Sequence, residues 1–244
     1  MAWVVLALAG ILAGIQNAVA GGGSFITLPA LIFTGLDARV ANITSTVALS
    51  VGQVTTGWGG RKAVQGVPGV PVWIMLAIAI GGGLVGAQLI LLTPTRVFAD
   101  MVPWLILAAT ALFAWGSFGP KPKEPRAPLA PLLSGAGLFL SSVYGGYFGG
   151  GNGIILVTVL TAAGLAIRGA SATKNVLAAI INVAAVGLFL FSPEVVWIKA
   201  LVLGAGAVLG GAIGNLVLAR INERVLRIAI VLIGVTLSIV LFMR

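Results

Sequence analysis

The stretch WIMLAIAIGGGLVGAQLILL, residues 73–92, carries no charged side chain. An α-helix rises 1.5 Å per residue, so about 20 apolar residues are enough to cross the ~30 Å hydrocarbon core of a bilayer. The run is solid, whereas a strand of a membrane β-barrel would alternate apolar and polar residues. Because backbone groups at that depth must hydrogen-bond within their own segment, the stretch predicts a membrane-spanning helix.

Similar stretches recur along all 244 residues, which are 59% hydrophobic and 8% charged. A soluble domain is about 25% charged, and this chain has too little polar surface to cover a domain in water. The sequence therefore predicts an all-α polytopic membrane protein whose outer partner is the lipid bilayer. The ten apolar stretches lie at residues 2–20, 24–36, 40–58, 70–92, 99–118, 131–148, 153–165, 170–191, 196–218 and 225–243.

The composition disfavours enzymes and nucleic-acid binding. The chain has no cysteine and no histidine, so thiol chemistry and the commonest general base and metal ligand are missing, and we expect no metal or cofactor. The net charge of +9 reflects 14 Lys+Arg against 5 Asp+Glu, which the positive-inside rule explains better than nucleic acid does. No carboxylate lies deep in a segment, so a proton relay is disfavoured. The apolar N-terminus lacks a basic region and reads as a first membrane segment, not a cleaved signal peptide.

The two halves of the chain read as a diverged repeat. The run GGGS at residues 21–24 matches GGGN at 149–152, and GL at 35–36 matches GL at 164–165 after one gap. Further on, GGLVG at 82–86 matches GGAIG at 210–214. We therefore predict a first repeat at 1–118, a polar, proline-rich linker at 119–130, and a second repeat at 131–244.

Each half contains one segment that is too short to span, at 24–36 and 153–165. Thirteen helical residues cover only ~20 Å, which predicts half-helices. If each forms a hairpin with the segment before it, three spanning helices remain per half, and the second repeat is inverted relative to the first. Loop charges in this topology place both termini outside the cell. The alternative merges each short segment with the next, giving four crossings per half and a parallel repeat.

The two triple-glycine breaks are the first candidates for a binding site. Ser24 and Asn152 follow them and are residue types that commonly cap helix N-termini. Each break would then start a half-helix with free N–H groups and a positive dipole end, which suits an anion. The alternative is close helix packing through small residues. The candidate residues here are Gly21, Gly22, Gly23, Ser24, Gly150, Gly151 and Asn152.

A polar stripe that follows each break supplies the second group of candidates. Polar side chains are costly against lipid, so they should face a cavity or bond neighbouring helices. Lys174 lies inside an apolar segment and would offset an anion, unless it extends to the membrane surface. The candidates in these stripes are Thr44, Ser45, Gln53, Thr173, Lys174, Asn175 and Asn182. The spacings Gly82–Gly86, Gly206–Gly210 and Gly210–Gly214 are interpreted as helix contacts.

These residues give the chain a resemblance to the sulfite exporter TauE/SafE family of prokaryotic membrane proteins. The matching runs are AGGGSFITLPAL at 20–31, A-x-x-T-S-T at 41–46, GGGNG at 149–153 and ATKN at 172–175. The resemblance covers essentially the whole chain. It implies a multi-pass protein of the inner membrane that exports sulfite, sulfoacetate or a related organosulfur anion.

The sequence thus predicts a transporter that binds a small anion between the two half-helix starts. The alternatives are a transporter of another anion, a cation or a neutral metabolite, with sodium coupling left open, and a structural subunit of a larger complex. Whether copies of the chain form a homo-oligomer is also left open.

Overall fold

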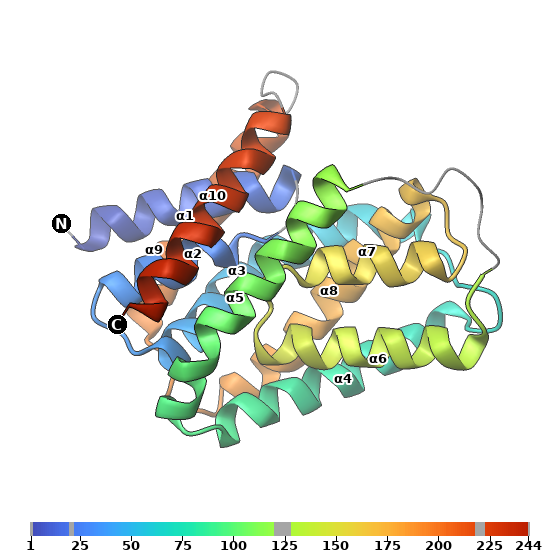
Figure 1. Cartoon of the computed structure of the whole chain (residues 1–244), viewed down its shortest axis with the longest axis horizontal. Coiled ribbons are helices and arrows are strands. Elements are labelled where there is room, and N and C mark those ends of the chain that lie inside the picture. Colours follow the sequence, from blue (N-terminus) through green and yellow to red (C-terminus); the bar gives the residue numbers. More distant parts are fainter. Residues whose placement is uncertain (1, 20–21, 120–127, 218–222, 244) are drawn as a thin grey trace.

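A computed structural model describes residues 2–19, 22–119, 128–217 and 223–243. These residues form ten α-helices and one short 3-10 helix (Figure 1) and contain no strand, so the all-α prediction is confirmed. The α-helices are α1 (Ala2–Val19), α2 (Ser24–Phe33), α3 (Ala38–Gly60), α4 (Val72–Leu92), α5 (Thr95–Phe118), α6 (Pro131–Tyr147), α7 (Asn152–Ala162), α8 (Ile167–Phe189), α9 (Trp197–Val217) and α10 (Glu223–Phe242), with η1 (Arg61–Ala63) after α3.

Several helices begin earlier than the apolar pattern predicts, and in α3 and α5 the reason is a polar first turn. Helix α3 begins at Ala38, where the Asp37 carboxylate accepts hydrogen bonds from the N–H groups of Arg39 and Val40, 3.0 Å each. Helix α5 begins at Thr95, directly after Pro94, whose carbonyl accepts the first helical bond from Phe98. Apolarity alone does not reveal such starts, because capping residues are polar.

The two short helices have 10 and 11 residues, and a glycine stands two residues after the end of each. Gly35 and Gly164 have φ values of +91° and +103°, a conformation that glycine adopts without strain. The next N–H groups, of Leu36 and Leu165, bond back to Leu31 O and Leu160 O at 3.3 and 3.0 Å. This is the Schellman arrangement that terminates helices. Both helices therefore stop a few residues before the predicted ends at 36 and 165.

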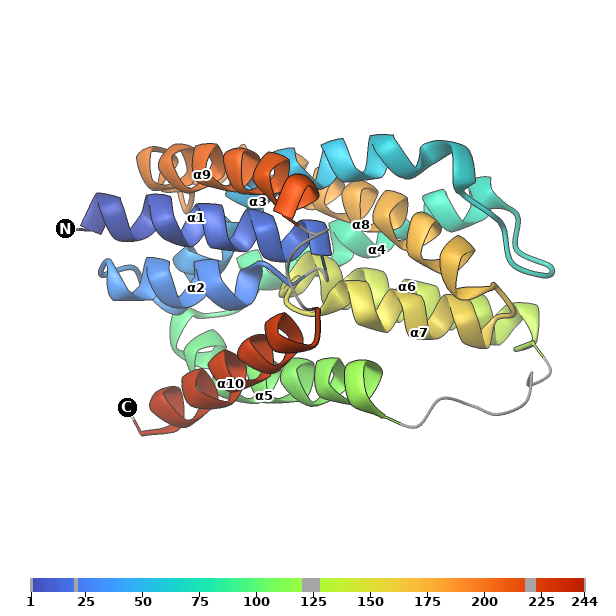
Figure 2. The same ribbon diagram turned by 90° about the horizontal axis from the view of Figure 1, so that it is seen from above.

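Each short helix forms a hairpin with the helix before it. Helix α2 packs on α1, and α7 packs on α6. In Figure 2 the two hairpins occupy opposite ends of the molecule, and α2 and α7 both start near its middle. Lys199 Nζ donates to Thr34 O at the outer end of α2 (2.9 Å), and Leu129 N donates to Ala162 O at the outer end of α7 (3.1 Å).

The long helices pack in pairs around these hairpins. Helix α3 contacts α8, α5 contacts α10, α1 contacts α9, and α4 contacts α6. Helices α4 and α8 are also in contact, as are α3 and α9. Glycines allow the close approach: a Cβ at Gly86 would strike Val143 O, and one at Gly210 would strike Ile11 O. The predicted helix contacts at Gly82–Gly86 and Gly206–Gly210 are confirmed. For the third predicted contact, Gly210–Gly214, the surroundings of Gly214 are not among those that the structure describes.

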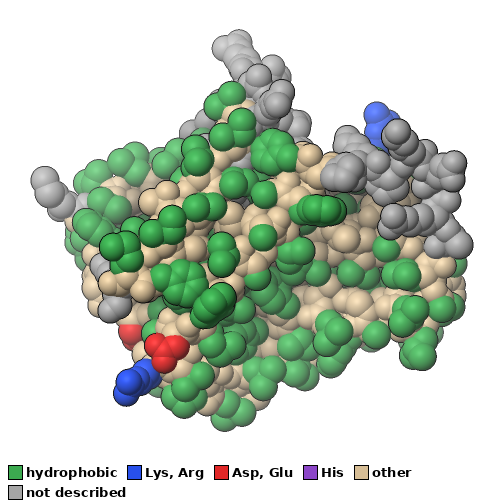
Figure 3. All heavy atoms as spheres, viewed as in Figure 1, with side chains coloured by type: hydrophobic (Ala, Val, Ile, Leu, Met, Phe, Trp, Pro, Cys, Tyr) green, Lys and Arg blue, Asp and Glu red, His purple; other side chains and the backbone are tan. Residues whose placement is uncertain are grey.

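The outer surface suits a bilayer. Three helices, Val72–Leu92, Thr95–Phe118 and Ile167–Phe189, are long and apolar enough to cross a membrane. Helix α3 has 23 residues but is not among them, because its polar stripe lowers its hydropathy. Figure 3 shows a face covered with apolar side chains, with the few visible charges toward its edges. Helix-end tryptophans are exposed, as expected of residues at a membrane interface: Trp3, Trp58, Trp73, Trp115 and Trp197.

Candidate functional site at the starts of the two short helices

The glycine run before α7 forms an open helix start. Gly149 and Gly151 have φ values of +76° and +74°, and Gly151 is the N-cap. The N–H groups of Asn152 and Ile154 bond to Gly149 O and Gly151 O at 3.3 and 3.0 Å. The N–H of Gly153 has no partner among the described residues. The start of α7 therefore offers a free donor at the positive end of the helix dipole.

The start of α2 is more fully bonded. Gly23 is the N-cap, and its N–H bonds to Asn17 Oδ1 of α1 at 2.7 Å. Further on, Phe25 N and Ile26 N bond to Gly22 O and Gly23 O, 3.0 Å each, while Ser24 N has no partner among the described residues. Gly21 lies outside the described residues. The expectation that Ser24 and Asn152 are N-caps is wrong for both: each is the first helical residue, because a glycine occupies the cap position.

The two helix starts lie close together. Phe25 of α2, which is 3% exposed, reaches the start of α7: its Cζ lies 3.6 Å from where a Cβ on Gly151 would stand. Ala109 of α5 borders the same point, with its Cβ at 3.2 Å. Figure 2 shows the starts of α2 and α7 meeting in the middle of the molecule. The ring of Phe25 thus lies between the two helix starts.

Lys174 of α8 extends to the start of α7. Its Cδ and Nζ lie 3.2 and 3.7 Å from where a Cβ on Gly153 would stand, so the absence of a side chain at Gly153 lets the ammonium approach. Within the described part of the chain the one ion pair joins Arg39 to Glu194, which leaves Lys174 without a carboxylate partner. An ammonium group beside the positive end of a helix is unfavourable unless an anion joins them.

Several other candidates of the polar stripe are bonded within the protein. Thr44 Oγ1 accepts from Val196 N in the loop before α9 (3.2 Å). Thr173 Oγ1 accepts from Gln65 N in the loop before α4 (3.0 Å). Ser45 Oγ lies 2.5 Å from Thr27 Oγ1, which joins α3 to α2. These three side chains hold helices and loops in place.

The amides of the stripe lie where α3 meets α8. Asn182 Nδ2 donates to Gln53 Oε1 and to Ala178 O, so these two candidates pair with each other. The backbone of Asn175 packs against Gly57 of α3. The structure therefore places Gln53 and Asn182 at the junction of the two central helices, and Lys174 and Asn152 at the start of α7.

Sequence reasoning missed the side chains that hold the glycine breaks. Gln16 Nε2 donates to Gly22 O (2.8 Å), and Tyr144 Oη donates to Gly150 O (2.7 Å). Each donor lies six residues before the glycine that it binds, so Gln16 and Tyr144 occupy equivalent positions in the two repeats. An alignment of the two halves could therefore have identified both residues. Each side chain fixes one peptide of a break.

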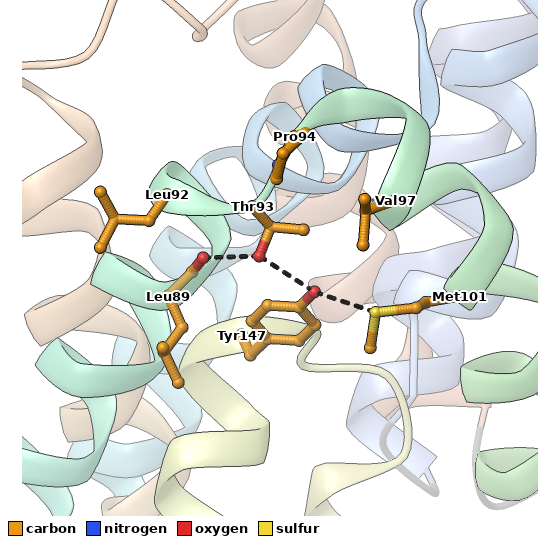
Figure 4. A pocket seen from close by; sticks show the side chains of 7 residues that line it. All are labelled: Leu89, Leu92, Thr93, Pro94, Val97, Met101 and Tyr147. Carbon is orange, nitrogen blue, oxygen red and sulfur yellow. Dashed lines mark hydrogen bonds between the residues drawn. The ribbon is translucent and has the colours of Figure 1, made fainter.

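A surface hollow lies between α4, α5 and α6, apart from the glycine breaks (Figure 4). Tyr147 Oη lies 3.4 Å from Thr93 Oγ1 and 3.7 Å from Met101 Sδ at its centre. The rest of its lining is mostly apolar and comprises Leu89, Leu92, Pro94 and Val97. None of the residues of the two glycine breaks lines this hollow.

An apolar helical bundle with two short helices that start at its centre has the features of a membrane transporter. The chain matches the family model "Sulfite exporter TauE/SafE" over residues 6–241 and belongs to that family of membrane transporters. Among its relatives, the "Probable membrane transporter protein" of Haemophilus influenzae is 29% identical over 94% of this chain and 90% of its own length. The "Probable membrane transporter protein ORF9" of Sinorhizobium is 29% identical over 96% and 90%, and the "Probable membrane transporter protein YfcA" of Escherichia coli K12 is 25% identical over 96% and 87%. No solved structure matches the chain significantly.

Proposed function

We propose that this transporter exports a small sulfur-containing anion, such as sulfite or an organosulfonate, across the inner membrane, and binds it at the start of α7, close to the start of α2. The observation that carries the proposal is Lys174, whose ammonium has no carboxylate partner among the described residues and lies beside Gly153, a residue with a free N–H. A bound oxyanion would accept hydrogen bonds from both groups and compensate their charge.

The pattern of helix contacts supports an inverted repeat around this site, with 1–118 and 131–244 as its halves. The contact of α1 with α9 has its counterpart in that of α6 with α4, and the contact of α2 with α1 in that of α7 with α6. Opposed hairpins whose short helices start at a common point are a frequent design of transport sites. Alternating access would come from movement of one half against the other.

The membrane potential is sufficient to drive export. A potential of ~100 mV, negative inside, favours the exit of a monovalent anion by about 2.3 kcal/mol, and of a dianion by about twice that. At equilibrium, the first value corresponds to a concentration ratio of roughly fifty. Export therefore needs no coupled ion.

Flux measurements test the proposal. Proteoliposomes that contain the purified protein should release labelled sulfite in response to an imposed potential, and Lys174→Gln should reduce this rate at least about tenfold. Lys62→Gln removes an exposed lysine in η1 and is the matched control, which should retain the wild-type rate. Equal rates in Lys174→Gln and the wild type would refute the site. A sodium-dependent flux of another solute, without sulfite flux, would favour the alternative substrate.

A further inference from the structure

Asn152 is a buried polar side chain at the start of α7 whose amide oxygen is unpaired. It is 4% exposed, and its Oδ1 has no hydrogen-bond partner among the described residues. Its amide packs against Gly145 of α6 so closely that a Cβ there would strike the nitrogen, with Ile181 of α8 alongside. Buried amides are nearly always paired, because an unpaired one loses its bonds to water without compensation.

The first half of the chain provides a comparison. There the asparagine near the break is Asn17 of α1, and its Oδ1 accepts the N–H of Gly23. The residue that corresponds to Asn152 is Ser24, a smaller side chain. The first half thus satisfies its asparagine oxygen internally, whereas the second half leaves the Asn152 oxygen free for a ligand.

The oxygen and the nitrogen of the Asn152 side-chain amide need different hydrogen-bond partners. The nitrogen donates, like Lys174 Nζ and Gly153 N, and an anionic oxygen satisfies all three. The oxygen Oδ1 accepts only, and an anion without a hydrogen cannot satisfy it. Among the described residues, the titratable groups that face the start of α7 are Lys174 and Tyr144, and the Tyr144 hydroxyl already donates to Gly150 O.

We propose that Asn152 makes the site selective for oxyanions that carry an O–H group, such as hydrogen sulfite or a hydroxyalkanesulfonate. This rests on the proposed function, because it assumes an anion at the start of α7. The anionic oxygens of the ligand bind Gly153 N–H and Lys174, and its O–H donates to Asn152 Oδ1. Sulfate dianion and simple alkanesulfonates leave that oxygen unpaired. Sites built to bond a hydroxyl reject the analogue that lacks it.

A pair of probes that differ in one hydroxyl tests the proposal: isethionate (2-hydroxyethanesulfonate) and ethanesulfonate. Titration calorimetry on the purified full chain at one fixed pH measures both dissociation constants. The wild type should bind isethionate about tenfold more tightly. In Asn152→Leu, which keeps the volume and removes both polar atoms, the two constants should agree within about twofold.

The matched control is Thr161→Val at the other end of α7. The Thr161 hydroxyl bonds within its own helix, to Val157 O and Thr158 O, so this variant should keep the tenfold preference. Asn152→Ala serves as a second variant should Asn152→Leu fail to fold. Equal affinities in the wild type, a preference that persists in both Asn152 variants, or no binding of either sulfonate would overturn the proposal. Anion binding with this preference but without sulfite flux in proteoliposomes would instead refute the proposed function.

Discussion

Lys174 combines a structural cost with the role in anion binding that we propose for it. A cation inside a membrane segment costs about 2.5–3.5 kcal/mol, and no carboxylate in the described part of the chain pairs with Lys174 to offset this. We expect Lys174→Met to raise the free energy of unfolding by about 1–2 kcal/mol, less than the full cost because the residue is only partly buried, and to abolish most sulfite flux. Denaturant unfolding in detergent together with flux in proteoliposomes checks both effects. A loss of stability would show that Lys174 is a structural residue.

Arg39 illustrates the opposite case, a charge that the protein satisfies internally. Its Nη1 donates to Leu91 O and Thr93 O, at 3.2 and 2.8 Å, at the end of α4, and its Nη2 pairs with Glu194. Cations are favourable at helix C-termini. These bonds account for the position of Arg39 at the start of α3.

The ion pair predicts a stability effect. Because the Arg39 and Glu194 side chains are 14% and 22% exposed, Glu194→Gln should cost about 1–2 kcal/mol, less than for a fully buried pair. Unfolding by denaturant measures this change in the free energy of unfolding. The double variant Arg39→Gln, Glu194→Gln should recover part of the stability that Glu194→Gln loses. An effect under about 0.3 kcal/mol would mean that the pair contributes nothing.

At the scale of the helices, apolar runs predicted all ten segments but not all their ends. The early start of α3 depends on the polar Asp37, and the ends of α2 and α7 depend on the backbone conformation of Gly35 and Gly164. The glycines that mark close contacts were predictable from their spacing, whereas their partners were not. The spacing of small residues shows which face of a helix permits close packing, but not which other helix packs against that face.

Substitutions of two glycines in α4 distinguish a glycine needed for helix packing from one that is not. A Cβ at Gly86 would strike the backbone at Val143 O, so Gly86→Ala should cost about 1–3 kcal/mol by forcing α4 away from α6. Gly81 has nothing within 4 Å of such a Cβ, so Gly81→Ala should gain about 0.5–1 kcal/mol from helix propensity. Thermal unfolding of the two purified variants compares them. Similar unfolding temperatures would argue against the packing of α4 on α6.

Across the whole molecule, the glycine breaks and the repeat pattern pointed to the starts of α2 and α7 as the candidate site. Sequence could not show that Thr44 and Thr173 bond loops, or that Gln53 and Asn182 pair with each other, because these partners lie far apart along the chain. It also could not show that Phe25 lies between the helix starts. Which polar residues remain unpaired, and so free for a ligand, depends on tertiary contacts.

The membrane orientation can be measured because the chain has no cysteine of its own. The N- and C-termini lie at one end of the molecule in Figure 2, and the loop after α3 lies at the other. With the more basic face in the cytoplasm, a membrane-impermeant maleimide applied to intact cells should label Asp37→Cys but not Lys62→Cys. Inside-out vesicles should reverse the pattern. Labelling of both variants from one side would contradict the proposed arrangement.

The most direct measurement is an anomalous-scattering map of crystals grown with selenite, the selenium analogue of sulfite. If the starts of α2 and α7 form the anion site, selenium should appear beside Lys174 Nζ and Gly153 N, with selenite oxygens about 3 Å from both nitrogens. The peak should vanish in Lys174→Met crystals. A selenium peak elsewhere in the bundle, or one at the same place in both proteins, would contradict the account.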